Sequence, residues 1–331
     1  MKNSMYRYLK LFLLLALSFF LITACYTQVT QKVDTSKPQL ATSNCRMVVH
    51  QLGKTCVPLQ PQRVIATDPF ALEVLLGLGL KPIATAEPNI VGSRGRHLSG
   101  RVEGVASLGK ISQINMERMV QLHPDLIVGF FMNSSSYELF SQIAPTVKAN
   151  FKYVKGTWKD SLREVASILG SNKEAESAIA NYQQRVKILR KAIERKLGRL
   201  EVSVSRFYAS PQNPPQFDTI LSFSGGILQE VGLEAPSQQL QLTTNSDTSY
   251  VLISLERIDL LDANTLFVML DPGAEDNFRR YQKSPLWQKL NVVQSKRVYT
   301  VDSGYWWLGN ILAANAILDD LYQYLGLQSQ I

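Results

Sequence analysis

The feature that most constrains the fold is an amphipathic run over residues 173–197, which contains neither Gly nor Pro. Its apolar side chains recur at steps of three and four, at Ala178, Ile179, Tyr182, Val186, Leu189, Ile193 and Leu197. That period predicts one α-helix, which at 1.5 Å per residue is roughly 37 Å long. Because neither flanking segment needs so long a helix for its own packing, the run predicts a rigid connector between two halves.

Strand-like and helix-like segments alternate on both sides of this run. Such alternation is typical of α/β folds with a parallel sheet and helices on its faces. We therefore predict an α/β fold with two doubly wound lobes joined by a single long α-helix. The predicted parts are a lipoprotein signal peptide at 1–24, a flexible tether at 25–43, an N-terminal lobe with a leading β-hairpin at 44–172, the connecting helix at 173–197 and a C-terminal lobe at 198–331.

The first 25 residues are typical of a bacterial export signal. Lys2, Arg7 and Lys10 precede an apolar run at 11–22, which is shorter than the roughly 20 residues of a membrane span. The small residues before Cys25 look like a lipobox, in which the cysteine thiol is lipidated and anchors the chain. We expect an exported, lipid-anchored protein that faces the periplasm or the cell exterior. An ordinary secretory signal with an incidental cysteine is the alternative.

Two further cysteines flank a predicted hairpin. Cys45 and Cys56 enclose two β-rich runs around a turn signal at 52–54. In an oxidising compartment, cysteines on facing strands are good disulfide candidates. A pair of free buried thiols is the alternative, and a zinc site is unsupported because there is no second cysteine pair or His/Cys cluster nearby.

Charge and motifs argue against several functions. The formal net charge is +8, but the basic residues form no long cluster, so the sequence does not indicate nucleic-acid binding. There are three histidines, His50, His97 and His123, of which only His97, in a loop with arginines, could reach a ligand. There is no Gly-x-Ser-x-Gly elbow, P-loop or Gly-x-Gly-x-x-Gly run. We predict a protein that is not an enzyme, with no cofactor and no directly bound metal. An exported α/β hydrolase and an adhesion or scaffold module are the competing classes.

An internal repeat relates the two predicted lobes. Residues 114–128 and 253–267 share Ile, a capping residue, an apolar residue, Glu-Arg, an apolar helix face and a buried strand. Asn115 and Ser254 are suitable N-caps. Glu117 and Glu256 then fall in the first helical turn, where the helix dipole favours a carboxylate, so helix stabilisation alone could explain both glutamates.

Candidate ligand-binding residues lie in loops that follow predicted strands, where open α/β sheets bind ligands. Guanidinium groups donate charge-assisted bonds to carboxylates or hydroxamates, and aromatic rings suit a planar or bulky partner. The combination predicts a bulky anionic ligand. The candidates are Arg94, Arg96, Phe131, Asn133, Arg206, Tyr208, Tyr250, Tyr305, Trp306 and Trp307.

From residue 45 to 327 the chain resembles the periplasmic ferric-siderophore-binding proteins of ABC importers, a class that includes vitamin B12 and haem binders. The matching segments are 50–58 (HQLGKTCVP), 61–64 (PQRV), 117–118 (ER), 123–127 (HPDLI), 143–146 (IAPT), 255–257 (LER), 284–287 (SPLW), 297–299 (RVY) and 311–321 (ILAANAILDDL). His123 stands where the family usually has lysine.

The resemblance implies a function and partners. It implies capture of a ferric siderophore of the hydroxamate or citrate type between the lobes, with iron held by the chelator. A vitamin B12 or haem receptor is the alternative within the class. It also implies that Glu117 and Glu256 contact arginines of a permease dimer, which suits two equivalent carboxylates on one rigid body. The expected protein is a lipid-anchored monomer that closes only slightly on its ligand.

Overall fold

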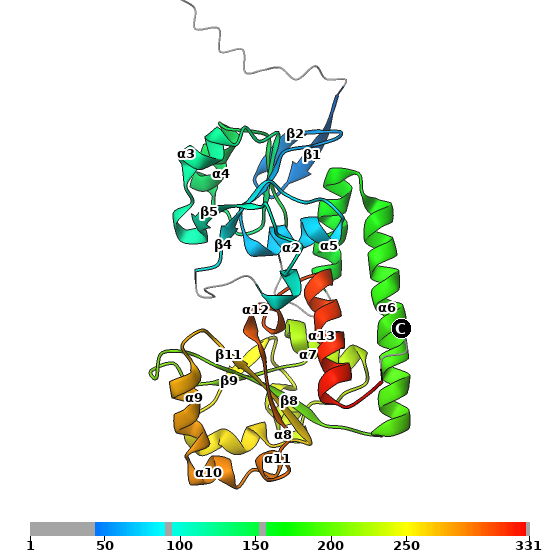
Figure 1. The fold of residues 1–331 in the computed structure, drawn as a ribbon, viewed down its shortest axis with the longest axis vertical. Helices are drawn as coiled ribbons and strands as arrows, with labels where there is room; N and C mark the ends of the chain where they lie inside the picture. Colours follow the sequence, from blue (N-terminus) through cyan, green and yellow to red (C-terminus); the bar gives the residue numbers. More distant parts are fainter. Residues whose placement is uncertain (1–43, 90–94, 152–156, 329–331) are drawn as a thin grey trace, which may run out of the picture. The chain divides into compact units, whose positions relative to one another are not determined.

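The computed structural model describes residues 44–89, 95–151 and 157–328. It contains two five-stranded sheets (Figure 1). The first sheet is parallel throughout and has the order β5–β4–β3–β6–β7. Its strands are β3 (Val64–Ala66), β4 (Ala84–Glu87), β5 (Ala106–Lys110), β6 (Leu126–Gly129) and β7 (Thr146–Lys148). The central strands β3 and β6 are completely buried, as their continuous apolar sequences predict.

The second sheet is mixed and has the order β10–β9–β8–β11–β12. Strands β8, β11 and β12 run parallel, whereas β9 and β10 pair antiparallel. The strands are β8 (Val202–Phe207), β9 (Gln216–Asp218), β10 (Tyr250–Leu252), β11 (Thr265–Leu270) and β12 (Val298–Asp302). The predicted α/β fold of two lobes is confirmed, and the antiparallel pairing of β9 and β10 is a departure from parallel order confined to this edge. The Pro-rich loop at 208–215 is too short for a parallel crossover, which needs a dozen or more residues.

Helices cover both sheets. In the N-terminal lobe they are α2 (Pro69–Gly77), η1 (Arg96–Leu98), η2 (Ile111–Gln113), α3 (Met116–Gln121), α4 (Ser134–Ser141) and α5 (Thr157–Leu169). In the C-terminal lobe they are α7 (Phe223–Glu230), α8 (Ser237–Thr243), η3 (Leu255–Leu261), α9 (Glu275–Gln282), α10 (Pro285–Gln288), α11 (Asn291–Gln294), α12 (Ser303–Trp306) and α13 (Ile311–Tyr324).

The predicted connector is confirmed as one helix, α6 (Asn172–Lys196), of 25 residues. It buries Ala175, Ile179, Tyr182, Leu189 and Ile193, the face that the three-and-four spacing predicts. Gly170 and Gly198 flank the helix with positive φ, which glycine adopts without a steric penalty. The chain passes between the lobes along α6 (Figure 1).

Helix α13 adds a second, non-covalent link between the lobes. It contacts α6, α2 and α5 as well as α7. The start of α13 donates hydrogen bonds to a carboxylate of the other lobe: Glu73 Oε1 on α2 accepts the backbone N–H groups of Asn310 and Ala313, each at 2.7 Å. One hydrophobic cluster accordingly runs from the first sheet to the second. We conclude that the two lobes share a core instead of hinging freely on α6.

The leading hairpin consists of β1 (Cys45–His50) and β2 (Gly53–Pro58), paired antiparallel. Cys45 and Cys56 form a disulfide with their Cα atoms 5.5 Å apart. Thr55 Oγ1 donates to the carbonyl of Thr146 at 2.7 Å and so attaches the hairpin to β7. His50 Nε2 lies 2.9 Å from Thr55 Oγ1, and burial lowers the pKa of its ring.

The signal peptide, Cys25 and the tether lie outside the described residues. Within the part of the chain that the structure describes, no helix is both long enough and apolar enough to cross a bilayer.

Candidate functional site

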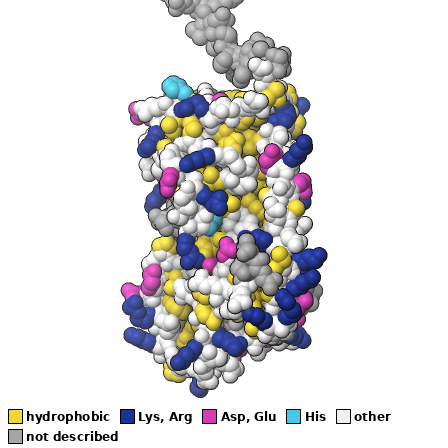
Figure 2. All heavy atoms as spheres, turned by 45° about the vertical axis from the view of Figure 1, so that its right-hand side comes forward, with side chains coloured by type: hydrophobic (Ala, Val, Ile, Leu, Met, Phe, Trp, Pro, Cys, Tyr) yellow, Lys and Arg dark blue, Asp and Glu magenta, His cyan; other side chains and the backbone are white. Residues whose placement is uncertain are grey.

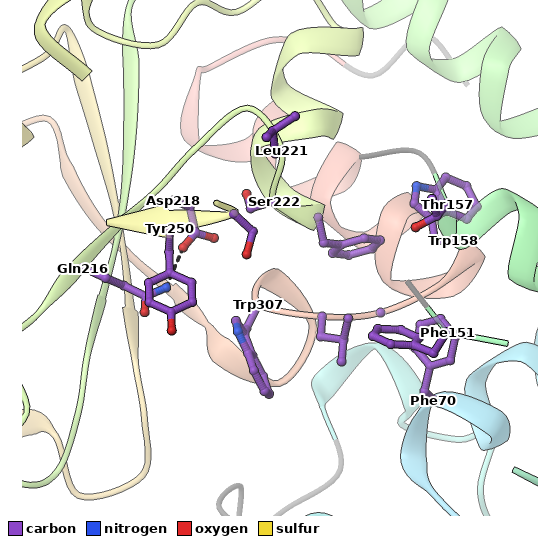
Figure 3. A pocket seen from close by; sticks show the side chains of 14 residues that line it. Phe70, Phe151, Thr157, Trp158, Gln216, Asp218, Leu221, Ser222, Tyr250 and Trp307 are labelled. Atoms are coloured by element: carbon purple, nitrogen blue, oxygen red, sulfur yellow. Dashed lines mark hydrogen bonds between the residues drawn. The ribbon is translucent and has the colours of Figure 1, made fainter. Parts of the chain in front are cut away.

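Two adjoining pockets lie at the carboxyl ends of strands, between α2 on one side and the second sheet on the other. They share Phe70, Trp307 and Leu308. We call the first, of about 520 Å³ including its open mouth, the aromatic pocket. The second, of about 1090 Å³ measured in the same way, is the larger pocket. Figure 3 shows the aromatic pocket, with Asp218, Gln216 and Tyr250 on one side and Phe70 and Phe151 on the other.

A cluster of phenylalanines forms the N-terminal wall. The ring of Phe70 meets those of Phe130 and Phe151 edge-on, with centroids 4.7 and 4.9 Å apart. Asp68 fixes this corner because its carboxylate accepts the backbone N–H groups of Ala71 at 2.8 Å and of Phe130 at 2.7 Å. Burial raises the pKa of Asp68, and these N–H donors oppose that rise. The carboxylate therefore joins the start of α2 to the end of β6.

Trp307 forms the wall that divides the two pockets. Its ring lies over Arg206, whose Cζ is 4.1 Å from the ring centroid. Arg206 is 3% exposed and donates two hydrogen bonds to Asp271, at 2.8 and 3.0 Å. The guanidinium is thus neutralised within the protein and supports Trp307 from behind.

Arg96 is also engaged by the protein itself. Asp320 on α13 accepts hydrogen bonds from Arg96 at 3.0 Å, from the Tyr305 hydroxyl at 2.6 Å and from Trp306 Nε1 at 2.8 Å. Tyr305 and Trp306 are almost completely buried, and burial raises the pKa of Tyr305. Neither residue lines the two pockets. Of the three aromatic residues at 305–307 that were expected to face a ligand, only Trp307 lines a pocket.

The structure brings three of the ten predicted ligand residues to the pockets. Tyr250 lines the aromatic pocket, Phe131 the larger one and Trp307 both. Asn133 instead caps α4, accepting the backbone N–H of Ser136 at 2.8 Å. Tyr208 donates its hydroxyl hydrogen to Gln216 Oε1 and lines neither pocket. The other candidates that line neither pocket are Arg96, Arg206, Tyr305 and Trp306. Arg94 lies outside the described residues.

The charge of the pockets differs from the expectation. Among the described residues that line them there is no Lys or Arg, whereas Asp218, Glu73 and Glu87 are present. Asp271 and Asp320 explain the difference, because each folds back on an arginine that was expected to face the ligand. On the face shown in Figure 2, basic side chains are scattered over both lobes and do not gather in one patch.

Two buried polar residues outside the ten predicted ligand residues, His97 and Glu73, line the larger pocket. The side chain of His97 is 4% exposed, and its Nε2 lies 3.6 Å from Glu73 Oε2. Neither ring nitrogen has a hydrogen-bond partner. His97 therefore offers an unsatisfied polar group to whatever enters this pocket. Its position between arginines in a loop was the available signal.

Asp218 and Gln216 are the corresponding missed residues of the aromatic pocket. They lie on β9, a three-residue strand that was not predicted, and their side chains are joined by a hydrogen bond of 2.8 Å. Burial raises the pKa of Asp218 to about 6. A carboxylate in a short strand after a Pro-rich loop carried no sequence signal that set it apart.

The repeated glutamates occupy equivalent places in the two lobes. Glu117 begins α3 after the edge strand β5, and Glu256 begins η3 after the edge strand β10. Both side chains are exposed. Asn115 caps its helix as expected, with its side chain accepting the N–H of Arg118 at 2.8 Å, whereas Ser254 makes no such cap. A hydrogen bond from Ser254 lowers the pKa of Glu256.

No group of three or more metal-ligating side chains (His, Cys, Asp or Glu) exists within the described residues. The pockets are thus built from aromatic walls, a few buried polar groups and backbone, which is the usual make-up of a small-molecule site.

Comparisons with known proteins agree with this architecture. The model of the periplasmic binding protein family matches residues 64–305. A probable siderophore-binding lipoprotein of Bacillus subtilis is 28% identical over 97% of this chain and 98% of its own length. An Fe(3+)-citrate-binding protein of the same organism is 26% identical over 79% of both chains. The crystal structure of Staphylococcus aureus SirA complexed with staphyloferrin B superimposes with a TM-score of 0.72 at 26% identity, covering 86% of this chain and all of that one.

Proposed function

Because this chain belongs to the periplasmic binding protein family, we propose that it captures a ferric siderophore between its two lobes and delivers it to an ABC importer. The chain is a binding protein and not an enzyme. The observation that carries the proposal is the pair of aromatic-walled pockets divided by Trp307, at the strand ends where this fold binds ligands. Iron arrives as part of the ligand and not as a cofactor.

The wall residues suit a bulky chelate. Phe70, Phe131, Tyr250 and Trp307 present rings from both lobes, so a ligand would be held by contacts on opposite sides. The link through α13 and Glu73 limits how far the lobes can move apart. Recognition therefore relies on a largely preformed cleft, with little hinge closure.

The chelate that we propose is of the hydroxamate or citrate type. A relative is named as an Fe(3+)-citrate-binding protein, which supports the citrate half of this proposal. A vitamin B12 or haem receptor is the second candidate. The aromatic wall favours it, because a flat macrocycle could stack on Trp307.

Delivery is proposed to use the two exposed glutamates. Glu117 and Glu256 start equivalent helices beyond the edge strands of the two sheets. A permease dimer with two-fold symmetry could receive one from each lobe through arginines. We further propose that lipidated Cys25 holds the monomeric protein at the membrane, outside the cytoplasm, with residues 26–43 as the tether.

Tryptophan fluorescence tests the proposed ligand class. The purified protein is titrated with ferric hydroxamate, ferric citrate, vitamin B12 and haem, and each chelator is also tested without iron. We expect saturable quenching by a ferric hydroxamate or citrate chelate, and a much smaller change in a Trp307→Phe variant. Quenching by vitamin B12 or haem alone would replace the first candidate by the second.

A further inference from the structure

The aromatic pocket has a buried carboxylate in its wall. Asp218 is 5% exposed, with one oxygen accepting from Gln216 Nε2 at 2.8 Å and the other from Ser224 Oγ at 2.9 Å. Ser222 is a further neutral side-chain donor, and since a carboxylate can accept about four hydrogen bonds, capacity remains for another. Within the described residues no ion pair reaches Asp218, because the nearby guanidinium of Arg206 is bound to Asp271.

The local charge balance is therefore negative. Arg206 and Asp271 cancel each other as a buried bidentate pair, and Asp218 remains uncompensated. The field of Arg206 lowers the pKa of Asp218, but burial outweighs it. A buried unpaired charge is unfavourable unless a partner of opposite sign arrives.

Six of the other residues that line this pocket are aromatic. They comprise Phe70, Phe151, Trp158, Phe223, Tyr250 and Trp307. Ring faces attract cations electrostatically, and they do so more strongly when water is excluded. In Figure 3 Tyr250 lies next to Asp218, Trp307 lies between the two sides, and Phe70 and Phe151 stand on the opposite side of the pocket. Aromatic walls together with one carboxylate are a combination that suits an organic cation and disfavours an anion.

We propose that the aromatic pocket binds a protonated amine of the ligand, with Asp218 as its counter-ion. The inference rests on the proposed function, since the amine would be an arm of the captured ferric siderophore. The iron centre would then occupy the larger pocket, on the other side of Trp307. A bare metal ion is not a suitable occupant, because the described lining of the aromatic pocket holds one carboxylate and no histidine or cysteine.

Matched chelates test the proposal. A linear ferric trihydroxamate and a citrate-based ferric chelate, each bearing a terminal primary amine, are compared with their N-acetylated forms by fluorescence titration. In at least one of the two pairs, we expect the amine-bearing chelate to bind at least 10-fold more tightly than its N-acetylated form at pH 7.5. In an Asp218→Asn variant this ratio should fall to about one, because the amide keeps the shape and loses the charge. An exposed carboxylate in the same lobe supplies the control, Asp276→Asn, which should keep the ratio.

Three results would overturn the proposal. Equal binding of the two forms in the wild type, or an unchanged ratio in Asp218→Asn, would remove the amine subsite and leave the proposed function in place. Absence of binding by every ferric chelate would overturn the proposed function and this inference with it.

The wild-type protein gives a second test that does not depend on a variant that folds. The preference for the amine should decline as the pH falls through about 6, where Asp218 becomes protonated. The groups facing Asp218 are neutral Gln216, Ser222 and Ser224, the Arg206–Asp271 pair, and Tyr208, whose pKa is raised by burial. A preference that stays constant from pH 7.5 to 5 would contradict the assignment of Asp218 as the counter-ion.

Discussion

Buried carboxylates decide what the aromatic and arginine residues of the cleft can do. Asp271 neutralises buried Arg206, which supports the ring of Trp307, whereas Asp320 pairs with Arg96, whose side chain stays 59% exposed. Asp68 and Glu73 accept backbone N–H groups and hold loops and helix ends in place. Asp218 alone among these five meets the pocket without a cation or a backbone donor, which makes it the residue with most to gain from a ligand.

The same reasoning predicts a conflict between stability and binding at Asp218. Its pKa is raised from 3.8 to about 6, so the native state binds more protons than the unfolded state between these values. The free energy of unfolding therefore falls as the pH rises through this range. Asp218→Asn should raise it at pH 7, by up to about 3 kcal/mol, and change it little at pH 3.5. Urea denaturation at both pH values measures this change. If Asp218→Asn lowers the free energy of unfolding equally at both, the hydrogen bonds of Asp218 and not its charge determine its effect on stability.

Glu73 gives a matched pair of variants for the contact between the lobes. Glu73→Ala leaves two buried N–H groups of α13 without an acceptor and should cost roughly 2–5 kcal/mol of unfolding free energy. Glu73→Gln keeps a carbonyl oxygen at that place and should cost clearly less. If the two variants have the same denaturation midpoint, the carboxylate is not the cap that links α2 to α13.

Periodicity predicted the long connecting helix and the central strands of both sheets. Helix α6 and the central strands β3, β6, β8 and β11 follow from apolar spacing alone. The short strands β9 and β10 were not predicted, because three residues show too little alternation of apolar and polar side chains to indicate a strand. The repeat placed the starts of α3 and η3, but η3 is a 3₁₀ helix that is interrupted at Arg257.

The site was predicted less well than the fold for a related reason. Sequence position shows which residues follow a strand, and three of the residues chosen on that ground, Phe131, Tyr250 and Trp307, line the pockets. It does not show which carboxylate from elsewhere in the chain will meet an arginine. Asp320 lies 224 residues from Arg96, and Asp271 lies 65 residues from Arg206.

The hairpin offers a prediction at the scale of an element. Its disulfide closes a loop with a sequence separation of 11, and loop-closure entropy of that size is worth about 3 kcal/mol. The double variant Cys45→Ser/Cys56→Ser should therefore unfold at a lower urea concentration than the oxidised wild type. The reduced wild type should behave like the variant, whereas a wild type that is insensitive to reductant would favour free thiols.

At the scale of the whole molecule, one core shared by both lobes fixes the distance between the repeated glutamates. Glu117 and Glu256 belong to lobes that α6 joins covalently and α13 joins by packing. A partner that contacts both residues at once would therefore meet them at a spacing set by this shared core. This suits a docking surface that is used in every transport cycle.

Charge reversal tests the docking surface separately from the cleft. The double variant Glu117→Arg/Glu256→Arg should bind the ferric chelate as the wild type does, because both side chains are exposed and line neither pocket. It should abolish iron uptake by cells that depend on this protein. Uptake at the wild-type rate, with the variant present at normal levels, would exclude these glutamates from docking.

Equilibrium dialysis against a radioactive ferric siderophore measures whether the cleft holds an intact chelate. We expect one bound chelate per chain at saturation, no iron retained when the chelator is absent, and loss of most of the affinity in a Trp307→Ala variant. Retention of iron without a chelator, or undiminished binding after removal of the indole, would contradict this expectation.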